Sequence, residues 1–207
     1  MQRISPALTW LDSPFGKALL ARISQLPGER VLVAVAGAPG SGKSTLAAAL
    51  AHRLPASALV PMDGFHLDDR LLTARGLLPR KGAVETFDAE GFATLIDRLA
   101  SAEHDVIYPI FDRDREIAIA GAGVVEPQHR IVIVEGNYLL LDARPWNQIH
   151  YDLTIRLDVP KDELTRRLTG RWQKLGKADE AVQAHLQNDL ANAQVVIEGI
   201  DRLQDNT

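Results

Sequence analysis

Short runs of apolar residues alternate along the chain with longer segments of helical periodicity. The clearest run, residues 31–36 (VLVAVA), is rich in β-branched side chains, which is typical of a strand buried on both faces of a parallel sheet. Similar runs at 58–61, 131–134 and 153–157 predict further strands, and 194–197 predicts a short fifth strand. Between these strands we expect helices, at about 66–75, 88–101, 161–174 and 178–192.

This alternation of strands and helices predicts an α/β domain with right-handed crossovers. The segment 105–126 differs, because two β-rich pieces flank the glycines of Gly121-Ala122-Gly123, and we expect it to form a hairpin inserted outside the sheet. Ser13 followed by Pro14 is typical of a helix start. No shift of composition marks a boundary, so residues 1–207 are expected to form a single domain.

A glycine-rich loop follows the first strand and precedes a helix. It reads GAPGSGKS and matches the pattern G-x-x-x-x-G-K-[ST]. Its glycines let the backbone approach phosphate oxygens, and the helix N-terminus adds positive potential. Lys43 can reach the β- and γ-phosphates, and the Ser44 hydroxyl can join a Mg²⁺ shell. We therefore expect ATP with Mg²⁺ to bind at Gly37, Ala38, Pro39, Gly40, Ser41, Gly42, Lys43, Ser44 and Thr45.

Two carboxylates follow predicted strands, at the sheet edge where α/β proteins bind ligands. Asp63 is suited to accept the proton of an acceptor hydroxyl during phosphoryl transfer, although Asp63-Gly64 also favours a plain turn. Glu135 is predicted to support the metal ion directly or through water, with Asp63 as a further metal candidate; the alternative for Glu135 is a capping or surface role. His66 can cap a helix, pack or contact substrate.

Composition narrows the possible partners. The net charge of −4 offers no general basic surface, which disfavours a nucleic-acid-dependent ATPase. The absence of cysteine excludes thiol catalysis and suits a reducing cytoplasm, where we expect the protein to reside. No stretch approaches the roughly 18 apolar residues of a membrane span, and the first residues lack the apolar core of a signal peptide.

Taken together, these motifs resemble the P-loop kinases of the uridine kinase, phosphoribulokinase and pantothenate kinase family. The resemblance extends over residues 30–200 and is carried by the phosphate loop and the segments VPMDGFH, ETFDAEGF, YPIFDRDRE, IVIVEG and LTRRLTGRW. It implies a three-layer αβα fold with a five-stranded parallel sheet in the order 2-3-1-4-5. It also implies transfer of the ATP γ-phosphoryl group to the hydroxyl of a small molecule such as a sugar, a nucleoside or a pantothenate-like compound. A homodimer is one assembly that it suggests.

The resemblance also implies where the acceptor binds. It brings Asp88 of ETFDAEGF near the substrate, and it leads YPIFDRDRE, with Phe111, Arg113 and Arg115, into the acceptor pocket. Uridine kinases usually have a tyrosine and a nearby histidine here, whereas this chain has two arginines, which would suit an anionic acceptor. The alternative is that these arginines pair with neighbouring acids of the segment 112–116. MDGFHLDD, FDRDRE and NDLANA further resemble bacterial proteins described as fructose transport system kinases.

The segment LTRRLTGRW resembles the family's lid helix, and we expect a lid at 160–178. The resemblance places an arginine, Arg167 or Arg171, over the phosphates, where it would stabilise charge while the lid excludes water. A surface ion pair between Glu163 and Arg167 is the alternative. Asn188 and Asn192 lie one helical turn apart and can either reach a ligand or end their helix.

Two functions stay open at this point. The first is an ATP-dependent kinase of a small hydroxylated metabolite, which Asp63 favours because a simple nucleotide-binding module needs no base. The second is an ATP-binding regulatory protein associated with sugar transport, without a phosphoryl acceptor. ADP release that depends on an acceptor separates the two.

Overall fold

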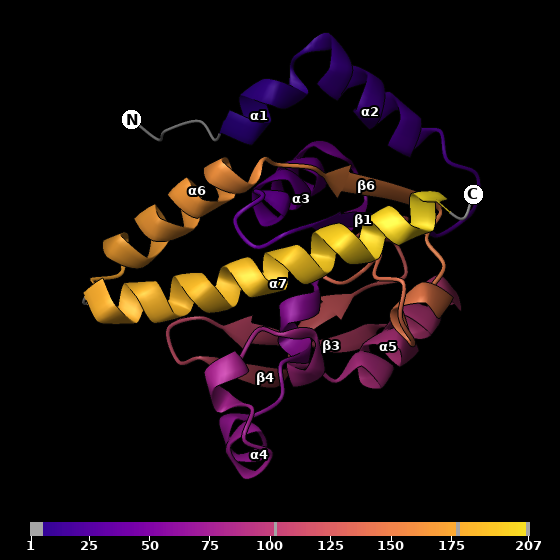
Figure 1. The fold of residues 1–207 in the computed structure, drawn as a ribbon. Coiled ribbons are helices and arrows are strands. Elements are labelled where there is room, and N and C mark those ends of the chain that lie inside the picture. Colours follow the sequence, from indigo (N-terminus) through magenta and orange to yellow (C-terminus); the bar gives the residue numbers. More distant parts are fainter. Residues whose placement is uncertain (1–5, 102, 177–178, 206–207) are drawn as a thin grey trace.

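The computed structural model describes residues 6–101, 103–176 and 179–205 (Figure 1). Its centre is a parallel sheet of the order β2-β5-β1-β6. The four strands are β1 (Val31–Gly37), β2 (Ser57–Pro61), β5 (Ile131–Gly136) and β6 (Leu153–Leu157). Counted along the chain, this order is 2-3-1-4, which agrees with the first four positions of the expected arrangement.

The predicted fifth strand is wrong. Residues 194–197 lie inside α7 (Asp179–Asp205), which also runs well past the predicted end of that helix. The buried residues there follow helical spacing, because Ala193 and Val196 are buried while Val195 is exposed. A short β-branched run therefore packs as one turn of a long helix.

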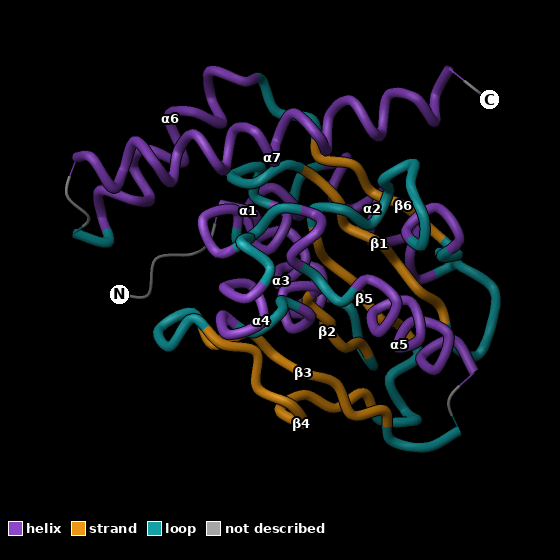
Figure 2. Tube along the Cα trace, turned by 60° about the horizontal axis from the view of Figure 1, so that its bottom comes forward, coloured by secondary structure: helices purple, strands orange, loops and turns teal. Residues whose placement is uncertain are grey.

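Helices cover both faces of the sheet and complete the three layers (Figures 1 and 2). One face packs on α1 (Pro6–Leu11), α2 (Pro14–Ser24) and α3 (Lys43–Arg53), and the other on α5 (Ala89–Ser101) and α7. Alternate residues of β1 supply the two cores: Val33 faces the α3 side and Ala34 the α5 side. All of β1 is buried, as its uninterrupted apolar run predicts.

The expected hairpin is present as β3 (Val106–Asp112) and β4 (Ile117–Val125), outside the main sheet (Figure 2). The Tyr108 hydroxyl donates to the Leu59 carbonyl oxygen at 2.8 Å and so fastens the hairpin to β2. The turn is formed by residues 113–116, not by the glycines of 121–123, which lie inside β4. Gly123 is needed for packing, since a Cβ there would lie 2.4 Å from the Tyr108 ring.

The remaining helices lie, along the chain, between the elements already named. They are α4 (Asp69–Ala74), α6 (Lys161–Lys174) and the short 3-10 turns η1 (Met62–Phe65), η2 (Leu78–Arg80), η3 (Val84–Thr86) and η4 (Trp146–Gln148). α6 has the predicted bounds and packs beside α7 (Figure 2). Residues 177–178 of the expected lid lie outside the described residues. Within the described part of the chain, no helix is long and apolar enough to cross a membrane.

The Ser13 side chain caps α2 as expected, because its Oγ accepts a hydrogen bond from the Gly16 amide at 3.1 Å. Pro14 occupies the first turn of that helix. The local rule for a helix start is therefore confirmed at this position.

Gly64, in the η1 turn after β2, packs against the backbone of the hairpin strand β3. We therefore expect Gly64→Ala to destabilise the protein. An added Cβ would lie 2.0 Å from the Pro109 carbonyl oxygen, so the hairpin backbone would have to move. Overpacking of this kind costs about 1–3 kcal/mol, which would lower Tm by several degrees in thermal unfolding. Gly170→Ala is the matched control: a Cβ there meets nothing within 4 Å, so Tm should hold or rise. An unchanged Tm for Gly64→Ala would contradict the close packing of β3 on η1.

Candidate active site

The phosphate loop lies between β1 and α3, as predicted. Its last residue before the helix, Gly42, has φ 95°, and Gly40 has φ 81°, a region that favours glycine. Gly40 also packs closely on α6, because a Cβ there would lie 3.0 Å from Leu168 of that helix. The Ser41 hydroxyl is buried and has no hydrogen-bond partner among the described residues. The loop is thus shaped by its own backbone and held against α6.

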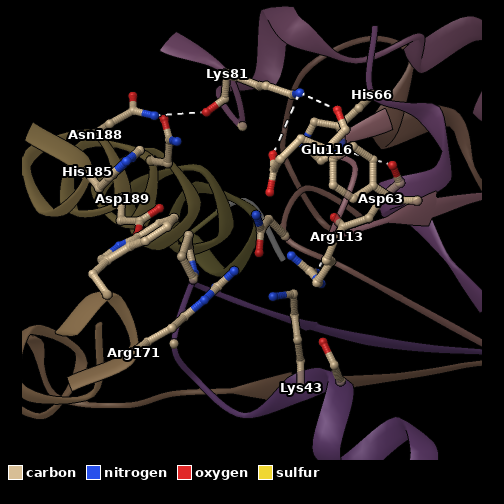
Figure 3. Close-up of a pocket in the computed structure, with 18 of the residues that line it drawn as sticks. Lys43, Asp63, His66, Lys81, Arg113, Glu116, Arg171, His185, Asn188 and Asp189 are labelled. Atoms are coloured by element: carbon tan, nitrogen blue, oxygen red, sulfur yellow. Dashed lines mark hydrogen bonds and ion pairs between the residues drawn. The ribbon is translucent and has the colours of Figure 1, made fainter. Parts of the chain in front are cut away.

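A cavity of about 770 Å³ opens above this loop (Figure 3). Such a volume falls in the range of small-molecule sites. Its walls come from the phosphate loop, the η1 turn, the loop 78–82, the hairpin turn, α6 and α7. Of the expected site residues, the following line it: Pro39, Gly40, Gly42, Lys43, Ser44, Thr45, Asp63, His66, Phe111, Arg113, Arg167 and Arg171.

Asp63 lies in the η1 turn directly after β2, with its carboxylate in an ion pair with Arg113 of the hairpin turn. The Asp63 side chain is 18% exposed and that of Arg113 is 55% exposed. Burial alone would raise the pKa of the Asp63 carboxyl, but nearby positive charge, led by Arg113 and including Lys43, outweighs it and holds that pKa below its usual value. Asp63 is therefore ionised at neutral pH.

Glu135 ends the buried run of β5 beneath the loop and is 5% exposed. The Ser44 hydroxyl donates to its Oε2 at 3.1 Å, so the two residues expected near the metal ion lie side by side. Burial raises the pKa of Glu135, partly offset by the charge of Lys43. A buried carboxylate beside a hydroxyl fits a divalent cation, whose charge would compensate the burial. The described residues contain no group of three acids or histidines for a metal, so phosphate oxygens would have to supply further ligands.

His66 packs between two aromatic rings, with ring centroids 4.1 Å from Phe87 and 4.6 Å from Phe111. Burial lowers the pKa of His66, so the ring is neutral at pH 7. Its Nδ1 lies 2.8 Å from the carbonyl oxygen of Asp63, which can only accept a hydrogen bond. Of the three roles considered for His66, namely capping, packing and substrate contact, the ring contacts show packing. The hydrogen bond from the ring also restrains the backbone of Asp63.

The helix expected to act as a lid, α6, contacts the phosphate loop through Arg167. Its Nη1 donates to the Ser41 carbonyl oxygen at 3.1 Å, and its Nε donates to Glu163 at 2.7 Å. Arg167 thus forms the surface ion pair with Glu163 and the contact with the phosphate loop at the same time. Arg171, one turn further on, points into the cavity (Figure 3). Its guanidinium carbon lies 5.2 Å from the centroid of the Trp172 ring.

α7 forms a further wall of the cavity and connects α6 with the loop 78–82. The ring of Trp172 in α6 stacks on that of His185, with centroids 4.1 Å apart, and its Nε1 donates to Asp189 at 2.8 Å. One residue earlier, the Asn188 side-chain amide donates to the Lys81 carbonyl oxygen at 2.9 Å. Asn188 and Asn192, which lie one helical turn apart, both line the cavity. The side-chain oxygen of each accepts a hydrogen bond from Arg80.

Lys81 is a cavity residue that sequence reasoning missed, since it belongs to no recognisable motif. Its Nζ lies 2.7 Å from an Asp69 carboxylate oxygen and donates to the Glu116 carbonyl oxygen at 2.7 Å. It also lies 5.4 Å from the Phe111 ring. Lys81 thus ties the loop 78–82 to the hairpin turn.

Two expected substrate residues do not line the cavity. The Asp88 carboxylate accepts from the Gly91 amide at 3.0 Å and caps the start of α5. Arg115 lies 3.6 Å from Asp112, which is the neighbouring-acid pairing considered as an alternative. Substrate roles for Asp88 and Arg115 stay predictions.

Comparison with known proteins agrees with this arrangement. A family model described as an AAA domain matches residues 33–188. A Schizosaccharomyces pombe protein named as a "putative uridine kinase" is 36% identical over 180 residues, which cover 79% of this chain and 77% of that protein. The pantothenate kinase of Streptomyces avermitilis is 28% identical over 162 residues, 72% of this chain but only 49% of that protein. This chain therefore spans about half the length of that relative.

A solved structure is also similar over nearly its whole length. The crystal structure of a "putative fructose transport system kinase" from Silicibacter sp. TM1040 has 49% sequence identity and a TM-score of 0.81. The match covers 93% of this chain and 94% of that one.

A buried strand, a glycine loop with lysine and serine, and a helix that starts at that lysine define a P-loop nucleotide-binding protein. Within that class, the chain belongs to the P-loop kinases of the uridine kinase and pantothenate kinase group. This family membership implies ATP as the nucleotide.

Proposed function

We propose that this protein is an ATP-dependent kinase that transfers the γ-phosphoryl group to a hydroxyl of a small metabolite. The observation that best supports this proposal is that Asp63 and Lys43 line the same cavity, whose walls include α6 and α7. The acceptor oxygen would bond to the γ-phosphorus while the bond from that phosphorus to the bridging oxygen of ADP breaks. The proton of the acceptor hydroxyl would move to the Asp63 carboxylate.

The donor end of the cavity is supported by the loop and the lid together. Lys43 provides a positive charge where the β- and γ-phosphates would lie, beside the amide groups that begin α3. Arg171 points into the same space from α6, and Arg167 holds that helix to the loop. These fixed charges are suited to stabilise negative charge in the transition state, because they need little rearrangement as it develops.

Mg²⁺ is the metal that these residues would hold, with Ser44 and Glu135 as its protein partners. When bound, the ion would offset the negative charge of the ATP phosphates. Asp63 is paired with Arg113, so we assign it to proton transfer and leave metal contact to the other two.

We expect Glu135→Gln to raise the Mg²⁺ concentration needed for half-maximal activity by about tenfold, since a neutral amide binds magnesium poorly. Titration of Mg²⁺ at saturating nucleotide would measure this, and calorimetry of Mg²⁺ binding to the protein–ADP complex gives a readout that needs no turnover. Glu126→Gln, in the loop after β4, is the matched control. An unchanged magnesium requirement in Glu135→Gln would contradict the metal assignment.

The test of the proposed function is ADP release from Mg-ATP with a panel of sugars, sugar phosphates, pantothenate and nucleosides. A kinase releases ADP in proportion to added acceptor and forms a phosphorylated product that mass spectrometry can identify. The competing function, an ATP-binding regulator of sugar transport, predicts nucleotide binding without any response to the panel. A homodimer also stays a prediction, which light scattering of the purified protein would decide.

A further inference from the structure

Arg113 covers the carboxylate that the proposed reaction needs as its base. Its Nη2 forms an ion pair with Oδ2 of Asp63. In Figure 3 this guanidinium lies between Asp63 and the tip of Lys43, which is the space that an acceptor hydroxyl would have to enter. A carboxylate oxygen held by a guanidinium is less available for a proton, and the guanidinium fills the space beside that oxygen. Opening the pair would therefore make Asp63 a better proton acceptor.

Arg113 is placed so that it can change partners. Its side chain is 55% exposed and belongs to the hairpin turn 113–116, while Asp63 is 18% exposed and lies on a strand end. Asp63 is its one ion-pair partner among the described residues. Movement of the exposed arginine, with the less exposed aspartate left in position, is thus the simplest way to open the pair.

A second cavity, of about 620 Å³, lies beyond Arg113 between the hairpin turn and α6. It is strongly cationic, with five basic side chains and two acids, namely Arg113, Arg166, Arg167, Arg171, Lys174, Asp114 and Glu116. Glu163 pairs with Arg166 and Arg167. Neither Arg171 nor Lys174 has a carboxylate within ion-pair distance in the described parts of the chain. A space lined by more positive than negative side chains favours an anion.

We propose that the acceptor carries an anionic group, a carboxylate or a phosphate, besides its hydroxyl, and that this group draws Arg113 away from Asp63. This inference rests on the kinase function proposed above and narrows its acceptor. The base becomes free only when an acceptor is bound, and its hydroxyl proton then moves to Asp63 as the phosphoryl group transfers. Water carries no such group, so Arg113 stays in place and ATP is protected from hydrolysis.

Matched acceptor pairs test the requirement for an anion. Pantothenate and pantothenyl alcohol differ in a carboxylate, and fructose 6-phosphate and fructose differ in a phosphate. With wild-type protein, we expect kcat/KM for ADP release to be at least about tenfold higher for the anionic member of whichever pair is accepted. Arg113→Met should lower that value by about ten- to a hundredfold, whereas the value for the neutral member should hold or rise because Asp63 is uncovered. Arg70→Met, on the exposed face of α4, should leave both values unchanged.

Arg113→Met also gives a readout that needs no acceptor. Because Asp63 is uncovered in this variant, we expect its background ATP hydrolysis to rise several-fold, and Asp63→Asn in the same variant should abolish the increase. Preference for a neutral acceptor, or hydrolysis that does not rise, would overturn the inference while the kinase function stands. A large loss of ATP affinity in Arg113→Met would also overturn it, since Arg113 would then serve the donor. If no acceptor raises ADP release, the proposed function and this inference both fail.

Discussion

Replacing Lys43 with methionine is expected to reduce kcat/KM for ATP by about a hundred- to a thousandfold. Lys43 is the first residue of α3 and lines the cavity directly above the phosphate loop. Methionine keeps much of the side-chain length but removes the charge, so the β- and γ-phosphates would lose their fixed cation in both the bound and the transition state. Loss of a single preorganised charge or donor at a reacting centre typically has an effect of this size.

Nucleotide binding provides the direct measurement, because it needs no knowledge of the acceptor. Calorimetric titration with ATP in the presence of Mg²⁺ should show weaker binding for Lys43→Met, with Tm of the free protein nearly unchanged. Lys17→Met is the matched control, since Lys17 is exposed on α2, away from the cavity. Normal ATP affinity together with normal turnover in Lys43→Met would contradict the role assigned to the loop.

The donor half of the site could be predicted from sequence because its parts are local. The phosphate loop, the strand before it and the helix after it are contiguous, and each is specified by residues a few positions apart. The approach of Ser44 to Glu135 is less local, yet it follows from the rule that parallel strands end at one edge of the sheet. Rules of this kind need the order of the strands but no side-chain detail.

The acceptor half could not be predicted in the same way. Lys81 enters the cavity from a loop without regular periodicity, and its position depends on contacts with Asp69 and with Glu116 from the hairpin turn. The two arginines of that turn are equivalent in the sequence pattern, yet Arg113 reaches Asp63 while Arg115 reaches Asp112. Their difference arises from the direction of the turn, which the Asp112 carboxylate sets by accepting from the amides of Asp114 and Arg115.

The error at residues 194–197 has a similar origin. A run of four residues shows too little periodicity to separate a buried strand from one turn of a helix. Here the outcome depends on α7 packing as a whole, with Asn188 and Asp189 holding its first half to the cavity and Val196 entering the core. Tertiary contacts therefore decide a choice that local propensity leaves open.

Asp63→Asn should lower kcat by about a hundred- to ten-thousandfold, the usual contribution of a positioned general base. Asparagine keeps the shape of the side chain but cannot take up the hydroxyl proton at neutral pH. ATP binding should stay within about threefold of wild type, because Asp63 lies outside the phosphate loop and Lys43 is unchanged. The split between kcat and ATP affinity is what distinguishes this variant from Lys43→Met.

Single-turnover measurements with the best acceptor of the panel would isolate the chemical step, and calorimetry would give the ATP affinity. Asp12→Asn is the control, since Asp12 forms an exposed ion pair with Arg53 far from the cavity. Undiminished turnover in Asp63→Asn would refute the assignment of the base. A rate loss accompanied by a matching loss of ATP affinity would instead show that the charge of Asp63 shapes the donor site, since a proton acceptor acts on kcat alone.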